Sequence, residues 1–158
     1  MPRYSREYPI HPIIGVGAVV LDGNKILLVK RGNEPYKGYW AIPGGIQRVN
    51  ESLKDAALRE LEEETGIKGV VEAIFWVDEI IERDDRGIKY HYVIIDLLVR
   101  PLSKDIRPSS DVLDARWFDI NEALKAKVTK TTYNLLLHLK KYGLSRTLPY
   151  LKATVVER

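Results

Sequence analysis

The most informative part of this sequence is residues 45–67, GIQRVNESLKDAALRELEEETGI. Both the fold and the chemistry of the chain can be predicted from it. Glutamate occupies four of the five positions from Glu60 to Glu64. A helix turns by about 100° per residue, so Glu60, Glu63 and Glu64 share one face within an arc of roughly 100°, whereas Glu62 points to the other side. Like charges so close together repel each other. Clustered carboxylate oxygens are the ligands that Mg²⁺ and Mn²⁺ prefer, which makes this face a candidate metal site.

The same helix carries an adjoining apolar stripe formed by Ala57, Leu58 and Leu61. A stripe of this kind can pack against a core and thereby fix the direction of the acidic face. By composition alone, a glutamate-rich helix is most often only a solvated surface. That interpretation suits Glu62, but the pattern around the helix argues against it for the other glutamates.

The whole stretch resembles the Nudix box, G-x5-E-x7-R-E-U-x-E-E-x-G-U, in which U is a bulky aliphatic residue. Nine specified positions at fixed spacing make this a specific signal. Every one of them is present, namely Gly45, Glu51, Arg59, Glu60, Leu61, Glu63, Glu64, Gly66 and Ile67. The flanks extend the resemblance, because residues 40–44 lead into the box and residues 115–118 are similar to the strand that closes many Nudix domains. The resemblance implies that residues 1–158 form a single Nudix hydrolase domain with a core of about 11–142.

Two positions depart from the commonest family sequences. Arg48 stands where an acid is frequent, and Asn50 stands where glycine is frequent. Asparagine tolerates the left-handed backbone conformation better than most residues, so a turn that usually contains glycine can still form at Asn50. Asn50 is also the predicted N-cap of the box helix, and Gly66 is predicted to end it.

The composition excludes several classes of protein. At 158 residues with 45% hydrophobic and 30% charged residues, the chain is expected to be one soluble globular domain. No apolar run approaches the roughly 18 residues of a membrane span, and the first residues lack the core of a signal peptide. Cysteine is absent, which excludes disulfides and thiolate chemistry. These features together favour a cytoplasmic protein. The net charge of +3 is too small to indicate that the protein binds nucleic acid.

The residue pattern predicts an α+β protein. Strands are predicted over 13–21, 25–30, 39–42, 70–82, 88–99 and 115–118, with a break at 43–45 and a hairpin loop at 84–87. A short helix capped by Asp119 and a last helix from Thr129 or Thr131 to Gly143 are expected to follow. The resemblance sharpens this prediction to the Nudix fold, an α/β/α sandwich with a central mixed β-sheet.

The family that this chain resembles hydrolyses a nucleoside diphosphate linked to another moiety and requires Mg²⁺ or Mn²⁺. Such cations neutralise phosphate oxygens, lower the pKa of bound water and align an in-line attack. By position, the resemblance implies that the metal ligands are the backbone carbonyl of Gly45 and the carboxylates of Glu51, Glu60, Glu63 and Glu64.

Arg59 is expected to pair with a carboxylate such as Glu51 and to fix the loop geometry, a structural role within the catalytic site. The group that activates water varies in the family, and three candidates stay open: Glu63, Glu64 and Asp111. Asp111 lies in the loop before the last predicted strand, where some members carry a catalytic glutamate. A solvated loop aspartate is the alternative interpretation of that residue.

Three further residues are candidates for binding the substrate. Arg31 and Lys37 can reach a phosphate, although solvated cations would explain them equally well. Trp40 can stack on a base, although a large aromatic beside a glycine pair is more often a packing residue.

The predicted substrate is ADP-ribose or a related nucleotide sugar, because residues 15–20 and 90–93 have a general similarity to ADP-ribose pyrophosphatase-like sequences. One alternative is a MutT-like hydrolase of (d)NTPs that sanitises the nucleotide pool. A different class of protein is a non-catalytic Nudix domain that senses a nucleotide. Partners other than the nucleotide, whether nucleic acid or membrane, are not expected, and a homodimer is expected by analogy alone.

Overall fold

The computed structural model describes residues 5–158. In chain order the elements are β1 (Ile13–Asp22), β2 (Lys25–Arg31), β3 (Trp40–Ala41), β4 (Gly44–Ile46), α1 (Leu53–Thr65), β5 (Gly69–Asp84), β6 (Gly87–Pro101), β7 (Val112–Asp119), α2 (Ile120–Lys125) and α3 (Lys130–Tyr142). No helix among these residues is long and apolar enough to cross a membrane.

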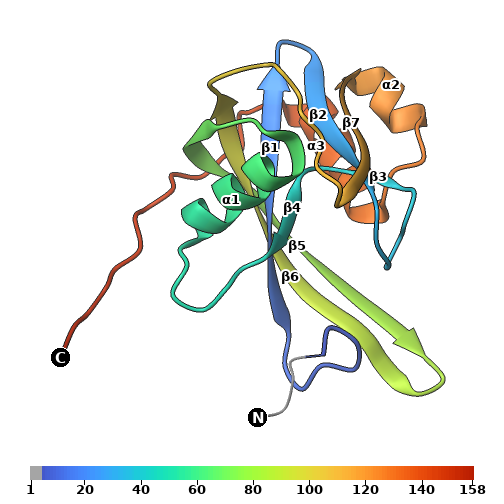
Figure 1. Ribbon diagram of the computed structural model, residues 1–158, viewed down its shortest axis with the longest axis vertical. Helices are drawn as coiled ribbons and strands as arrows, with labels where there is room; N and C mark the ends of the chain where they lie inside the picture. Colours follow the sequence, from blue (N-terminus) through green and yellow to red (C-terminus); the bar gives the residue numbers. More distant parts are fainter. Residues whose placement is uncertain (1–4) are drawn as a thin grey trace.

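Within residues 5–158, seven strands form one sheet with β1 at its centre. The main path runs β3-β2-β1-β6-β5, while β4 pairs with β1 and β7 pairs with β2 (Figure 1). The β1–β6 pair is parallel, whereas β1–β4 and β5–β6 are antiparallel. The predicted mixed sheet is therefore confirmed.

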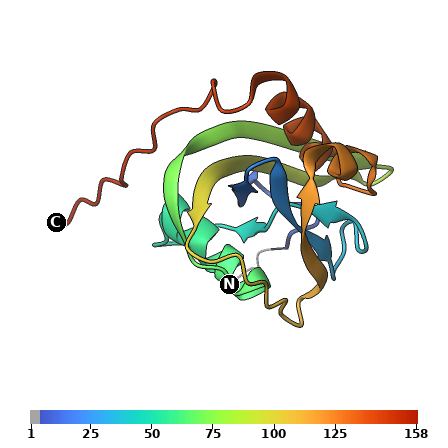
Figure 2. The ribbon, with the colours of Figure 1, turned by 90° about the horizontal axis from the view of Figure 1, so that it is seen from above.

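Helices cover both faces of the sheet, and the alternation of side chains along β1 shows why. Neighbouring residues of a strand point to opposite faces. Val16 and Val20 pack in one buried cluster with Leu61 of α1, whereas Val19 packs in a second cluster with Leu135 of α3. Figure 2 shows α1 and α3 on opposite sides of the curved sheet. The predicted three-layer α/β/α arrangement is confirmed.

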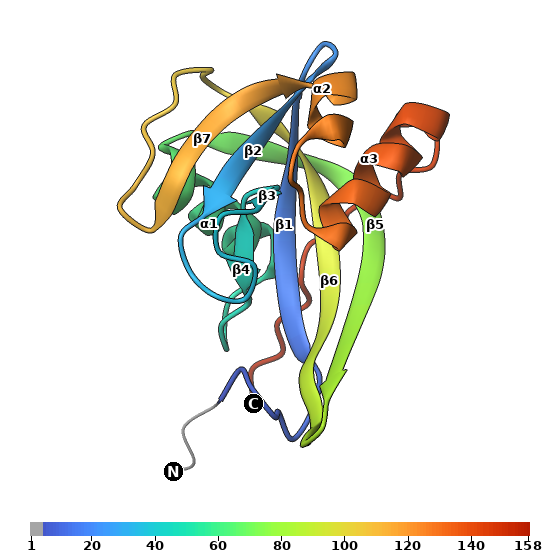
Figure 3. The ribbon, with the colours of Figure 1, turned by 90° about the vertical axis from the view of Figure 1, so that its right-hand side faces the viewer.

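The longest strands, β5 and β6, form an antiparallel hairpin that reaches beyond the helices (Figure 3). They confirm the predicted strands 70–82 and 88–99, and both are somewhat longer than predicted. Tyr92, Ile94 and Asp96 alternate along β6 and thus point to one face of the sheet. That face is opposite the one that α1 covers.

The sequence prediction of a break at residues 43–45 was wrong for Gly44 and Gly45. Both residues belong to β4 and pair with Gly17 and Val16 of β1. A Cβ added at Gly44 would lie 2.3 Å from the carbonyl oxygen of Val16, so the absence of a side chain is what lets the two strands approach. Glycine is needed here because two backbones lie close together, and not because the chain turns.

The predicted N-cap of α1 was also wrong. Ser52 caps the helix, and its hydroxyl accepts a hydrogen bond from the backbone N–H of Asp55. Asn50 instead adopts the left-handed conformation with φ 65°, which agrees with its expected tolerance of that region. The other predicted ends are confirmed, because Gly66 ends α1, Asp119 caps α2, and α3 runs from the Thr129 cap to Gly143.

Candidate functional site

Helix α1 packs against the sheet along one side and has a capped C-terminal end. Ala57 and Leu61 are fully buried in the cluster that joins α1 to the sheet. At the C-terminal end, the Gly66 N–H donates to the carbonyl oxygen of Glu62 at 2.8 Å. With the apolar side of the helix buried, its acidic face is directed toward β4 and the loop that follows β4.

The guanidinium group of Arg59 lies among three carboxylates. Its Nε donates to Glu51 Oε2 at 2.6 Å, and its Nη2 donates to Glu51 Oε1 at 3.0 Å. Its Nη1 donates to Glu60 Oε1 at 2.7 Å and to Glu63 Oε2 at 3.3 Å. Nη2 also donates to the carbonyl oxygen of Ile46 at 3.2 Å, which ties the helix to β4.

These contacts keep both partners charged. The hydrogen bonds from Arg59 lower the pKa of Glu51 below its usual range. In return, the hydrogen bond to Glu51 raises the pKa of Arg59 above its ordinary value. The pair therefore has the structural role that the sequence pattern implied for Arg59, because it holds the loop after β4 against the first turns of α1.

Glu60 and Glu64 lie against the backbone of β4. The Gly44 N–H donates to Glu64 Oε1 at 3.4 Å. A Cβ added at Gly45 would lie 2.3 Å from Glu60 Oε1, so the Glu60 carboxylate rests directly on this glycine. Burial, and next the charge of Glu60, raise the pKa of Glu64 to about 8. Two acids in one confined space behave in this way because the charge of one opposes the ionisation of the other.

The remaining two glutamates of the helix are both exposed but have different charged partners. The Glu63 side chain is 49% exposed and lies at the edge of the acidic face. Glu62 is exposed and lies 3.9 Å from Lys68, away from Arg59. The prediction that Glu62 belongs to the solvated side is confirmed.

Within residues 5–158, no three acidic, histidine or cysteine side chains converge on one point as metal ligands do. The guanidinium of Arg59 instead pairs with both Glu60 and Glu63. The chemistry of the donors nevertheless fits a hard divalent cation. Glu60 and Glu64 place carboxylate oxygens beside the Gly45 backbone, and oxygen ligands of this kind are those that Mg²⁺ takes.

The loop between β6 and β7 crosses the C-terminal end of α1. The Ser109 N–H donates to the carbonyl oxygen of Glu64 at 3.3 Å, and the Arg107 N–H donates to that of Thr65 at 2.7 Å. Asp111 follows in the same loop, where its backbone N–H bonds to the Ser109 hydroxyl and the residue is exposed. The fold brings the loop of Asp111 to the helix but leaves the Asp111 side chain exposed.

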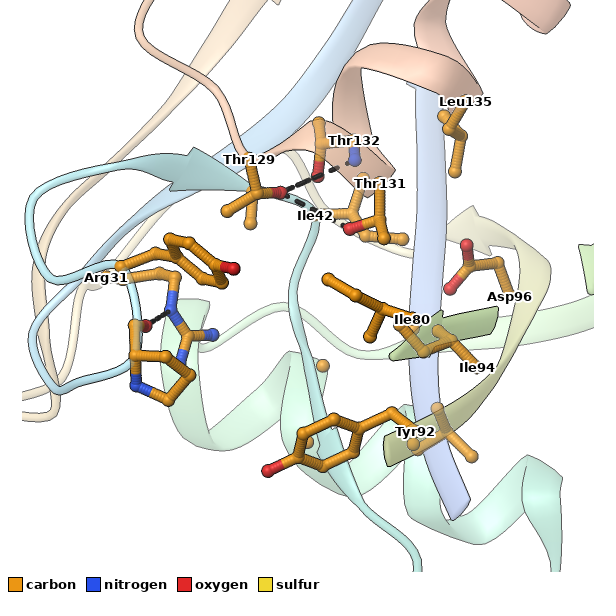
Figure 4. Close-up of a pocket in the computed structure, with 18 of the residues that line it drawn as sticks. Arg31, Ile42, Ile80, Tyr92, Ile94, Asp96, Thr129, Thr131, Thr132 and Leu135 are labelled. Carbon is orange, nitrogen blue, oxygen red and sulfur yellow. Dashed lines mark hydrogen bonds between the residues drawn. The ribbon is translucent and has the colours of Figure 1, made fainter. Parts of the chain in front are cut away.

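A cavity of about 190 Å³ borders the acidic face at Gly44 and Gly45 (Figure 4). Arg31 lines this cavity, and its Nε donates to the carbonyl oxygen of Pro35 at 2.8 Å. The Arg31 charge also acts on Glu64 and opposes the rise of its pKa. The fold thus brings one of the three candidate substrate-binding residues to the cavity and to the acidic face.

The other two candidates lie elsewhere. Lys37 is exposed in the loop before β3. Trp40 is only 8% exposed, and its ring packs edge to face against Phe118 with 4.8 Å between the ring centroids. This position favours the packing interpretation of Trp40 over stacking on a base, because its ring is enclosed in the core.

The sequence pattern did not identify several of the residues that line the cavity. Asp96 of β6 and Thr131 at the start of α3 both line it, together with Tyr92 and Ile80 from the long hairpin. The only sequence signal was an acid inside the apolar run of residues 93–99, VIIDLLV. A charged residue in such a run needs either a partner or a function.

Comparison with known proteins gives a consistent result. The family model described as NUDIX domain matches residues 11–139. An ADP-ribose pyrophosphatase of Methanocaldococcus jannaschii is 34% identical over 116 residues, which are 73% of this chain and 67% of that protein. The human protein named nucleoside diphosphate-linked moiety X motif 6 is 28% identical over 157 residues, 99% of this chain but only 49% of that protein. The chain thus spans about half the length of the human relative.

A solved structure agrees with the fold. The NUDIX domain of Shewanella oneidensis NrtR, complexed with ADP ribose, superposes with a TM-score of 0.69 at 25% identity. The match covers 83% of this chain and 88% of that domain.

Proposed function

The chain belongs to the NUDIX domain family of hydrolases, and we propose that it hydrolyses the pyrophosphate bond of ADP-ribose or a related nucleotide sugar with Mg²⁺ or Mn²⁺. One observation carries the proposal. The acidic face of α1 meets the cavity at Gly44 and Gly45, so that clustered carboxylates border a pocket with a cationic wall at Arg31. An extended substrate can lay its diphosphate across this junction while another part enters the cavity.

The residues that would hold the cation are Glu60, Glu63 and Glu64, with Glu51 and the Gly45 carbonyl as further ligands. When bound, a divalent cation neutralises phosphate oxygens and lowers the pKa of coordinated water. The chain itself contributes the arrangement of the ligands, because Arg59 fixes Glu51 and Glu60 through hydrogen bonds of 2.6 and 2.7 Å. Arg59 is thus a positioning residue.

Arg31 is suited to bind the diphosphate. It lies on the cavity wall close enough to Glu64 for their charges to interact. A guanidinium group can donate two parallel hydrogen bonds to a phosphate, which fixes both orientation and distance. Lys37 is exposed and would contribute only to the general attraction of an anion.

The proton of the attacking water has three candidate acceptors, and their positions differ. Glu64 lies against β4, Glu63 is half exposed at the edge of the same face, and Asp111 is exposed in the loop that crosses the end of α1. Single substitutions at the three positions rank them by their effect on kcat at saturating metal.

The support for ADP-ribose comes from the relatives, since the archaeal protein is named for this activity and the Shewanella domain is complexed with ADP ribose. A hydrolysis screen over ADP-ribose, sugar nucleotides, dinucleoside polyphosphates and (d)NTPs tests the proposal. AMP and ribose 5-phosphate as products would support it. A nucleoside monophosphate and pyrophosphate from (d)NTPs would indicate the MutT-like activity, and ADP-ribose binding without turnover would indicate a sensor.

A homodimer and a cytoplasmic location are further proposals that rest on the family alone. Light scattering at several protein concentrations tests the first of them, with a constant monomer mass as the contradicting result.

A further inference from the structure

Asp96 is an acid in the middle of an apolar strand. It is 4% exposed, and its neighbours along β6 are hydrophobic. Burying a carboxyl group costs free energy unless its oxygens find hydrogen-bond partners. Trp76 satisfies one oxygen, because its indole Nε1–H donates to Asp96 Oδ2 at 2.9 Å. The other oxygen, Oδ1, is buried and has no hydrogen-bond partner among the described residues.

The space around Oδ1 depends on a glycine. Asp96 pairs with Gly17 across the β1–β6 ladder. A Cβ added at Gly17 would lie 2.2 Å from Asp96 Oδ1 and 2.6 Å from Ile42 Cδ1. Any larger residue at this position would therefore displace the carboxyl group. Figure 4 shows that group turned toward the interior of the cavity, in the region of Thr131 and Ile80.

Several of the side chains that line the cavity with Asp96 are aliphatic. Ile80 and Ile94 come from the hairpin, Ile42 from the segment between β3 and β4, and Leu135 from α3. Pockets for drug-sized ligands measure about 300–1,000 Å³. The cavity of about 190 Å³ is smaller, so it suits one planar ring system rather than a whole nucleotide. Gly17 pairs with Asp96 on one side and with Gly44 on the other, and the acidic face lies beside Gly44 and Gly45, where the diphosphate is proposed to bind.

We propose that Asp96 selects the nucleobase: its Oδ1 accepts a hydrogen bond from the exocyclic amine of adenine and disfavours a base that carries a carbonyl at the same ring position. The inference rests on the proposed function, because it takes a substrate that contains adenine. With a base that carries a carbonyl, Asp96 Oδ1 would face a second acceptor and stay without a hydrogen bond in a buried site. The loss of binding free energy is then larger than that of one hydrogen bond, and polar pockets reject close analogues in this way.

The protonation of Asp96 would respond to the bound base. Burial, with the charge of Asp78 as a further cause, raises its pKa to about 7. The ionised form, which has only acceptors, is stabilised by an amine donor. Adenine would thus supply the partner that the strand itself lacks.

The test compares ADP-ribose with inosine diphosphate ribose, in which a carbonyl replaces the amine. Wild type should prefer ADP-ribose by roughly 10- to 100-fold in kcat/KM, with most of the difference in KM. In Asp96→Asn, the amide oxygen can accept from Trp76 and the amide nitrogen then faces the cavity as a donor. This variant should lose or invert the preference. Asp22→Asn makes the same change at a carboxylate that lies outside the cavity lining and pairs with Lys104, and it should keep the preference.

A binding measurement separates this inference from the proposed activity. Calorimetry with AMP and IMP needs no turnover, and wild type should bind AMP roughly 10- to 100-fold more tightly. If ADP-ribose is not hydrolysed but AMP is preferred and Asp96→Asn removes the preference, the activity fails and the base selection stands. Equal affinity of the wild type for AMP and IMP overturns the inference, even if circular dichroism shows that Asp96→Asn does not fold.

Discussion

Arg59 holds both carboxylate oxygens of Glu51, with Nε 2.6 Å from Oε2 and Nη2 3.0 Å from Oε1. Glu51 precedes α1, whereas Arg59 lies on the helix, so the pair joins the loop to the element that carries the acidic face. A bidentate contact fixes orientation as well as distance. The same guanidinium reaches Glu60 at 2.7 Å, and the position of one proposed metal ligand therefore depends on another.

Replacing Arg59 by lysine should damage the site while keeping a positive charge. An ammonium group cannot make the bidentate contact, so Glu51 and Glu60 lose their fixed positions. We expect kcat/KM for ADP-ribose to fall about 10- to 100-fold and the free energy of unfolding to fall by about 1–3 kcal/mol. Steady-state kinetics and urea unfolding check both. Wild-type activity in Arg59→Lys would show that the pair does not position the ligands.

The two partly buried glutamates of α1 should be far more sensitive than their exposed neighbour Glu62. Glu60→Gln and Glu64→Gln keep the volume but remove a carboxylate that the proposed cation needs, and each should lower kcat by about 100-fold or more. Glu62→Gln on the solvated side is the matched control and should retain activity. Equal effects at all three positions would mean that the helix acts only through its overall charge.

Alanine at two adjacent glycines should separate stability from activity. At Gly44 the added Cβ meets the carbonyl oxygen of Val16, so we expect the free energy of unfolding to fall by about 1–3 kcal/mol. At Gly45 it meets the end of the flexible Glu60 side chain, which can move aside. Gly45→Ala should therefore lose activity with a smaller loss of stability. The reverse order in thermal unfolding and kinetics would contradict this account.

Asp96 should make stability depend on pH. Its pKa is about 7 in the folded protein and about 3.9 in an unfolded chain. Between these values the folded state binds the proton more tightly, so the contribution of Asp96 to the free energy of unfolding falls as the pH rises from about 4 to 7. Asp96→Asn should remove this slope.

Urea unfolding at pH 5, 6, 7 and 8 measures the difference between wild type and Asp96→Asn. Wild type should lose stability relative to the variant across this range. Asp22→Asn, at a carboxylate that forms an ion pair with Lys104 at 3.0 Å, is the control for the same chemical change. A constant difference between wild type and Asp96→Asn would show that Asp96 does not titrate with a raised pKa.

The acidic helix could be predicted from the sequence because its signals are local. The spacing of Glu60, Glu63 and Glu64 defines one face of a helix, and the nine positions of the Nudix box lie within 23 consecutive residues. Gly66 ends the helix as predicted, because the residue after the helix adopts the left-handed backbone conformation, which glycine adopts most easily. The two long strands at 70–82 and 88–99 and the hairpin loop between them were likewise predicted from local residue pattern.

The cavity could not be predicted, because it depends on contacts between distant parts of the chain. Asp96 acquires its environment from Gly17 on β1 and Trp76 on β5, and the register that brings them together is not visible in any one segment. The same applies to Trp40, whose position in the core is set by Phe118 on β7. Gly44 and Gly45 were read as a break for a related reason, since only the approach of β1 shows that they form a strand.

The most direct test of the central claim is the rate of AMP release from ADP-ribose by wild type, Glu63→Gln and Glu62→Gln, each with Mg²⁺, with Mn²⁺ and with a chelator. The account predicts metal-dependent release by wild type and Glu62→Gln, no release with the chelator, and a loss of about 100-fold or more in Glu63→Gln. Undiminished release by Glu63→Gln, or release that persists in the chelator, would contradict hydrolysis at the acidic face of α1.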